Sequence, residues 1–109
     1  MRIPEKIKIG GYMVDVELES NLMTDRQHNG EYHPRTQTIK IDKDCSGQER
    51  EEVFIHEVLE AIKAIYDIPL EHRDLTLIAT VLHQIIKDNP EIFRGGQKHS
   101  LTTILIPGR

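Results

Sequence analysis

The chain is poor in three features that commonly identify a class of protein. It has one cysteine, Cys45, among 109 residues, so an internal disulfide framework is excluded and a reducing compartment is expected. It has no apolar run long enough to cross a bilayer, and its first residues are not expected to begin a signal peptide. It also lacks an excess of basic charge, since its net charge is −4, which argues against broad binding of nucleic acid or of an anionic membrane. We therefore expect a cytoplasmic protein whose partners are neither nucleic acid nor membrane.

The first half of the chain has the pattern of β-strands. Residues 6–9 and 12–18 alternate in polarity on either side of Gly10-Gly11, a two-residue turn typical of a β-hairpin. Residues 31–33 and 38–42 form a second candidate pair of strands. In residues 38–42 the isoleucines point one way and the polar residues the other, as in a half-buried strand. We expect these segments to form one antiparallel or mixed sheet.

The second half predicts two helices. Ser46 and Glu49 form a capping box, so the first helix should run from about residue 47 to residue 66. The second should run from residue 69 or 70 to residue 88, where Asn89-Pro90 ends it. Apolar spacing predicts the packed faces, which are Phe54, Val58, Ala61, Ile62 and Ile65 in the first helix and Leu75, Ile78, Ala79, Leu82, Ile85 and Ile86 in the second.

Strands followed by helices indicate a single domain of the α+β class, in which two packed helices follow the sheet. We expect this domain to span residues 1–93. Residues 94–109 form a tail, in which residues 101–106 are apolar and β-prone. That stretch could add an edge strand, or pair with a second copy of the chain to make a homodimer.

The most informative chemical signal is a pair of ligand-type side chains in the first predicted helix. His56 and Glu60 are four residues apart, so they leave the same face one turn apart. Glu57 is turned about 100° from His56, where it can reach a water molecule held by its neighbours. This is the H-E-x-x-H zinc helix with glutamate in place of the second histidine, and Glu57 stands at the general-base position. A lone H-E-x-x-E is a weak motif, so a third ligand is required.

Five other histidines are candidates for that third ligand. His72 is the best, because it begins the second predicted helix after a short turn and can fold back onto the first helix. His83 lies eleven residues farther, about 16 Å along a helix axis, so it cannot share the ion and is expected in or beside the core. His33 lies on a strand that could border the site, while His28 and His99 lie in loop-like segments.

The predicted site therefore consists of His56, Glu60 and His72, with Glu57 as the general base. Two imidazoles and one carboxylate are the ligands of a thermolysin-like zinc site in a different chain order. Zn²⁺ bound there would polarise an amide carbonyl and acidify water, whose proton Glu57 would take. The alternative reading of the same spacing is an ordinary solvent-facing pair on a helix.

Three segments resemble the small zincin-like proteins of phages and prophages, which are minimal metallopeptidase-like domains. They are Ile55-His56-Glu57-Val58-Leu59-Glu60-Ala61-Ile62, Pro69-Leu70-Glu71-His72 and Leu82-His83-Gln84-Ile85-Ile86-Lys87-Asp88-Asn89-Pro90. Residues 38–42 also look like the zincin edge strand that lies over the active-site helix. The resemblance covers roughly residues 5–90. It implies an α+β zincin core in a bacterial host cell, zinc at His56, Glu60 and His72, and Glu57 as base, although the family pattern has histidine at position 60.

Two functions are compatible with this reading. A zinc-dependent hydrolase, foremost a peptidase, is favoured by the intact Glu57, because a purely structural site needs no base. A non-catalytic zincin-fold module that binds a host or phage protein is favoured by the small size of the chain. A third reading compares Glu57-x-x-Glu60 and Glu71-x-x-Asp74 with the Mg²⁺-binding acidic pairs of all-helical nucleotide pyrophosphohydrolases, but the strand-rich first half does not suit that fold.

Overall fold

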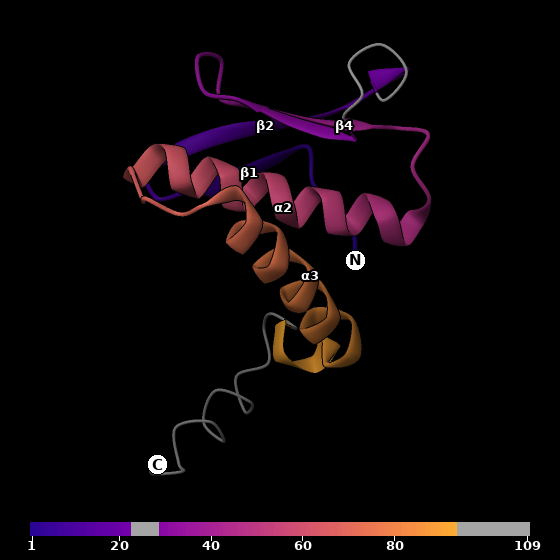
Figure 1. Cartoon of the computed structure of the whole chain (residues 1–109). Coiled ribbons are helices and arrows are strands. Elements are labelled where there is room, and N and C mark those ends of the chain that lie inside the picture. The colour runs from indigo at the N-terminus through magenta and orange to yellow at the C-terminus, as the bar shows by residue number, and fades with distance from the viewer. Residues whose placement is uncertain (23–28, 94–109) are drawn as a thin grey trace, which may run out of the picture.

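The computed structural model describes residues 1–22 and 29–93, which form a four-stranded sheet followed by two helices (Figure 1). The elements are β1 (Lys6–Ile9), β2 (Tyr12–Glu19), β3 (Gly30–His33), β4 (Thr38–Asp42), α2 (Gly47–Tyr66) and α3 (His72–Asp88), with a short 3-10 helix at Pro90–Phe93. Helix α2 lies along one face of the sheet, and α3 packs against α2 and extends away from the sheet. The predicted α+β class is confirmed.

Strands β1 and β2 form the predicted hairpin. They pair antiparallel with Ile9 opposite Tyr12, and Gly10 has a φ of +59°, in the left-handed region that favours glycine. A Cβ atom at Gly10 would also collide with the Tyr66 hydroxyl at the end of α2. The turn therefore favours glycine at this position, and a larger residue would also displace the exposed Tyr66 side chain.

The sheet is mixed, with the strand order β1-β2-β4-β3. Strand β4 pairs parallel with β2, which places Ile39 beside Val16, and antiparallel with β3, which places Ile39 beside Tyr32. The expectation that residues 38–42 form the edge strand is therefore wrong, because this strand is internal and β3 is the edge. Thr38 and Asp42 are also buried, since β4 has a neighbouring strand on each side.

Helix α2 has the predicted bounds. Its first turn is capped by Ser46, whose hydroxyl accepts a hydrogen bond from the Glu49 backbone N–H at 3.2 Å. It ends at Asp67, which has a left-handed conformation with φ 53°. Of the predicted packed residues, Phe54 and Ala61 are buried, and Val58, Ile62 and Ile65 are partly buried against the core. Ile55 and Glu57 are buried as well, and the Glu57 side chain lies beside Gly30 of β3.

Helix α3 begins at His72, with Glu71 as its N-cap, two or three residues after the approximate start predicted at residue 69 or 70. Leu75 and Ala79 are buried in its contact with α2, but Ile78 and Ile85 are 44% and 37% exposed. These two were wrongly predicted to be core, because α3 packs along a narrow stripe. No other described element covers its outer face.

Within the described ranges, no helix is both long and apolar enough to cross a membrane. Residues 94–109, including the apolar stretch proposed as an edge strand, lie outside the described residues, as does His28.

Candidate metal centre

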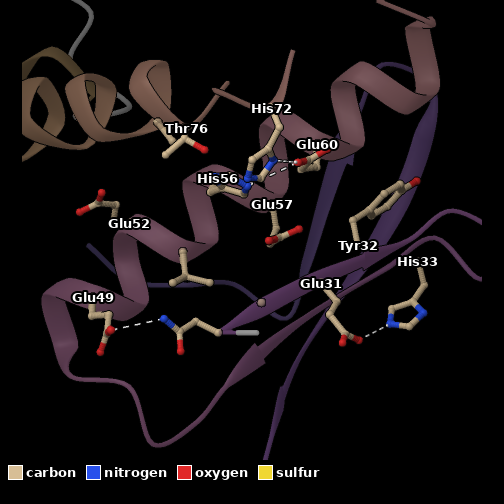
Figure 2. Close-up of a pocket in the computed structure, with 14 residues that line it drawn as sticks. Glu31, Tyr32, His33, Glu49, Glu52, His56, Glu57, Glu60, His72 and Thr76 are labelled. Carbon is tan, nitrogen blue, oxygen red and sulfur yellow. Dashed lines mark hydrogen bonds and ion pairs between the residues drawn. The ribbon is translucent and has the colours of Figure 1, made fainter. Parts of the chain in front are cut away.

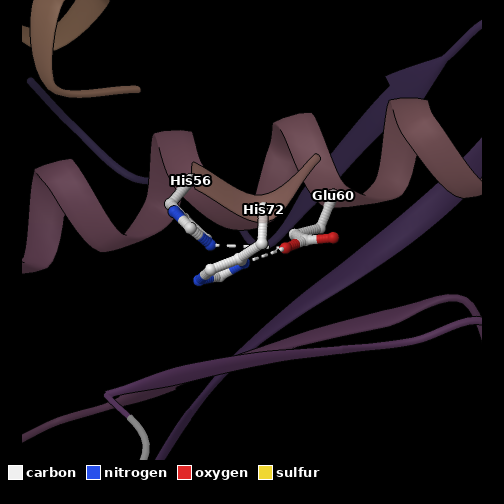
Figure 3. Close-up of side chains that lie close together, drawn as sticks. All are labelled: His56, Glu60 and His72. Carbon is white, nitrogen blue, oxygen red and sulfur yellow. Dashed lines mark hydrogen bonds and ion pairs between the residues drawn. The ribbon is translucent and has the colours of Figure 1, made fainter. Parts of the chain in front are cut away.

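The three predicted ligands come together where the start of α3 crosses over the middle of α2 (Figure 3). His56 and Glu60 lie one turn apart on α2, and His72 is the first residue of α3. The left-handed turn at Asp67 ends α2, and the short connection to Glu71 brings His72 back over α2. Among the described residues, this is the group of three ligand-type side chains that could hold a metal ion.

The spacing of the donor atoms fits a small, tetrahedrally coordinated ion. Glu60 Oε2 lies 3.4 Å from His56 Nε2 and 3.3 Å from His72 Nδ1. Ligands at 2.0–2.1 Å from a tetrahedral zinc ion would lie about 3.3 Å apart. All three donor atoms lie within 4.8 Å of one another. Two imidazoles and one carboxylate are also a donor set that zinc accepts, so the residues present fit a single ion.

Burial differs among the three ligands, and it gives the site an open side. The side chains of His56 and Glu60 are 18% and 27% exposed, whereas that of His72 is 74% exposed. Burial lowers the pKa of His56, although the neighbouring Glu60 carboxylate opposes that shift. A neutral imidazole is the form that binds a metal. His56 is therefore suited to be a ligand at neutral pH, and His72 lies at the rim.

Glu57 lies beside this group without belonging to it. Its side chain points from α2 toward β3 (Figure 2) and is only 7% exposed. Burial, with the nearby carboxylates of Glu60 and Glu31, raises the pKa of Glu57 to about 8. No described residue forms a hydrogen bond or ion pair with it. A buried carboxyl group that shares a pocket with three metal-ligand side chains is in a suitable position to exchange a proton with a bound molecule.

The position of Glu57 depends on a glycine in the edge strand. A Cβ atom at Gly30 would lie 2.5 Å from Val53 Cγ1 and 3.0 Å from Glu57 Cγ, closer than side chains can pack. Only glycine therefore lets β3 lie directly over this part of α2. Gly30 was not predicted to have this role, although a glycine within a strand often marks a close approach of another segment.

The ligands open into a pocket of about 950 Å³ between α2, α3 and β3 (Figure 2). Its lining includes Asn29, Glu31, His33, Glu49, Glu52 and Thr76 in addition to the residues already named. His33 accordingly borders the site, as the sequence analysis considered, and its Nε2 lies 2.8 Å from Glu31 Oε1. Glu49 and Glu52 were missed as pocket residues, although their spacing of seven and four residues before His56 already places them on its helix face.

Other predicted roles are resolved by the same geometry. His83 is 7% exposed and forms a 3.0 Å hydrogen bond with Glu51, so it is the core or boundary histidine that was expected. The four-stranded sheet rules out the all-helical pyrophosphohydrolase fold. Glu71 and Asp74, the second acidic pair of that reading, do not line the pocket.

Comparison of the chain with protein-family models, curated proteins and solved structures found no match in any of the three. Its function must therefore be inferred from the site itself.

Proposed function

We propose that this protein is a zinc-dependent hydrolase of peptides, built on a zincin-like core and acting in the cytoplasm of a bacterial host of a phage or prophage. The observation that carries the proposal is the convergence of His56, Glu60 and His72 in a pocket that also contains the buried Glu57. A structural metal site would need the ligands alone, whereas hydrolysis also needs a base that is not a ligand.

The residues of the chain have distinct roles in this proposal. His56, Glu60 and His72 would hold the ion, which supplies Lewis-acid polarisation of a carbonyl group and promotes the ionisation of water. Glu57 receives the proton from the attacking water and delivers it to the leaving amine. The absence of a side chain at Gly30 leaves the space beside β3 that the Glu57 side chain occupies.

A peptide is the favoured substrate class because β3 is an edge strand beside the pocket. In the described sheet β3 pairs with β4 on one side only, and all four of its residues line the pocket. An unpaired strand edge offers backbone N–H and C=O groups to an extended chain. A peptide bound along that edge would have its backbone held by hydrogen bonds to β3 and would pass beside the metal ligands.

The resemblance of the H-E-x-x-E helix and the following segments to small phage zincin-like proteins supports this proposal. The order of the elements also agrees with it, because a sheet precedes the helix that carries His56, and an edge strand lies beside that helix. The glutamate at position 60 differs from the family pattern, but its carboxylate lies at a ligand distance from both histidines.

A second candidate is a non-catalytic module of the same fold that binds a host or phage protein. The observation that favours it is the outer face of α3, where Leu77, Ile78, Val81 and Ile85 are all exposed. Contiguous exposed apolar residues often mark a contact surface. The two candidates differ in whether the zinc-loaded protein cleaves peptides.

The test starts with protein purified without a metal-affinity tag. Elemental analysis is expected to find one zinc per chain, and zinc-loaded protein is expected to release new amino termini from a mixed peptide library. Chelation should stop the release, and added zinc should restore it. Failure to bind zinc would refute the metal site, whereas zinc binding without cleavage would favour the second candidate.

A further inference from the structure

The negative charge of this protein is concentrated at its pocket. Five of the fourteen lining residues are glutamates, namely Glu31, Glu49, Glu52, Glu57 and Glu60, and none of the fourteen is lysine or arginine. The whole chain has 18 acidic and 14 basic residues. With these five glutamates removed, 13 acidic residues remain against 14 basic ones. The rest of the chain is thus nearly neutral, and the pocket accounts for the acidic balance.

A metal ion would neutralise only part of this charge. The ion would lie against Glu60, with the buried Glu57 beside it, which leaves Glu31, Glu49 and Glu52 as the remaining carboxylates of the pocket. Glu31 is paired with His33 at 2.8 Å. Glu49 and Glu52 form hydrogen bonds with neutral groups, the Asn29 amide at 3.4 Å and the Thr80 hydroxyl at 2.8 Å. Their negative charges therefore remain available to a ligand.

These two glutamates lie on one side of the metal group along α2. Glu52 and Glu49 precede His56 by four and seven residues, which corresponds to about 6 and 10 Å along the helix axis. An extended peptide rises about 3.3 Å per residue, so these distances correspond to two or three residues. A second feature also points to a ligand in this pocket. The side chain of Glu57 is 7% exposed, points into the pocket and has no hydrogen-bonding partner among the described residues.

We infer that the pocket selects peptides that carry lysine or arginine two or three residues from the peptide bond placed at the metal group, with Glu49 and Glu52 as the residues that determine this preference. The inference rests on the proposed function for the identity of the substrate class. A cleft lined by one sign of charge raises the local concentration of ligands of the opposite sign. Complementary charge also excludes acidic peptides more strongly than it favours basic ones.

The test measures binding separately from cleavage. The protein is zinc-loaded Glu57→Gln, in which hydrolysis is blocked but Glu49 and Glu52 are kept. The probes are three fluorescein-labelled octapeptides of equal length, with Arg, Gln or Glu at two central positions in a Ser/Ala background. Fluorescence anisotropy is expected to show the Arg peptide bound about tenfold more tightly than the Gln peptide, the order expected for two partly exposed ion pairs. The preference should weaken as salt is raised.

The matched variants identify the residues responsible. Adding Glu49→Gln and Glu52→Gln should remove most of the preference for arginine. Adding Glu5→Gln and Glu17→Gln, which change the net charge equally at exposed positions outside the pocket, should leave it unchanged. Equal binding of the three peptides, no binding of any peptide, or a preference that survives the loss of Glu49 and Glu52 would overturn the inference. Selective binding of the Arg peptide without cleavage by the wild type would instead refute only the hydrolase.

Discussion

Replacing Glu57 by glutamine tests the chemistry of the site and the burial of this side chain in one variant. Glutamine has nearly the same shape as glutamate but remains neutral at every pH. Because Glu57 is not one of the ligands, zinc binding should be retained. If Glu57 is the general base, hydrolysis by the zinc-loaded protein should fall by about 10²–10⁴-fold. In the metal-free protein the same change should alter stability, because the Glu57 carboxyl is buried.

The size of the stability effect follows from the pKa of Glu57, which folding raises from 4.5 to about 8. Between these two values the folded state holds a proton that the unfolded state has lost. The contribution of Glu57 to the free energy of unfolding is therefore fully present below pH 4.5 and is lost as pH rises through 8. At about 1.36 kcal/mol per pKa unit, the cost at pH 7 is up to about 3 kcal/mol. Metal-free Glu57→Gln should therefore be more stable than wild type at pH 7, and the difference should vanish near pH 4.5.

Urea unfolding of the metal-free proteins from pH 5 to pH 8 measures this difference. The control is Glu52→Gln, five residues earlier on α2, where the side chain is less buried and the amide can still accept the hydrogen bond from Thr80. Glu52→Gln removes the same charge at this less buried position, so any gain should be smaller than that of Glu57→Gln. A Glu57→Gln protein with no stability gain at any pH would show that the carboxyl is accessible to water. Full hydrolytic activity in the zinc-loaded variant would show that another group is the base.

Four further outcomes are expected. His56→Ala should abolish stoichiometric zinc binding and Glu60→Gln should weaken it, as measured by calorimetry, and an unchanged stoichiometry would place the ion elsewhere. Gly30→Ala should lower the free energy of unfolding by about 1–3 kcal/mol, because its Cβ would meet Val53 at 2.5 Å; an unchanged urea midpoint would contradict this contact. His83→Ala should cost about 1–3 kcal/mol in urea unfolding, because it removes a buried side chain and its hydrogen bond with Glu51, which keeps only its ion pair with the amino group of Met1. The hydrogen bond to His83 lowers the pKa of Glu51. The stability that ionised Glu51 contributes is therefore present above pH 4.5 and is lost as pH falls through the pKa of Glu51 in the folded protein. The free energy of unfolding of Glu51→Gln should accordingly fall less steeply with acid in the same titration.

The part of the site that could be predicted from the sequence is the part that depends on local geometry. His56 and Glu60 had to share a face because an α-helix repeats every 3.6 residues. His72 could be placed beside them because the connection to α3 is short. The capping box fixed the start of α2 for the same reason, since all of its interactions lie within one turn. Each of these predictions depends only on residues that are close together in the sequence.

The features that were missed depend on contacts between distant segments. Strand β4 was expected at the edge, but its parallel pairing with β2 joins residues more than twenty positions apart, and alternation within one strand does not reveal its neighbours. Ile78 and Ile85 fit the helical period of a packed face, yet the period cannot show how wide the contact between α2 and α3 is. Gly30 acquires its role only when β3 lies over Glu57.

The pairing of β3 with β4 determines where the chain can tolerate insertions and deletions during evolution. Gly30 faces Glu57 only in the observed register, in which Gly30 is opposite Ile41. Side chains alternate between the two faces of a strand, so a shift of one residue would turn Glu31 toward α2 instead. Adding or removing one residue in the turn at residues 34–37 would cause such a shift, and Gln37 already has a left-handed φ of 51° there. Among homologues, length changes should therefore be absent from this turn and should gather between β2 and β3, where they leave the register intact.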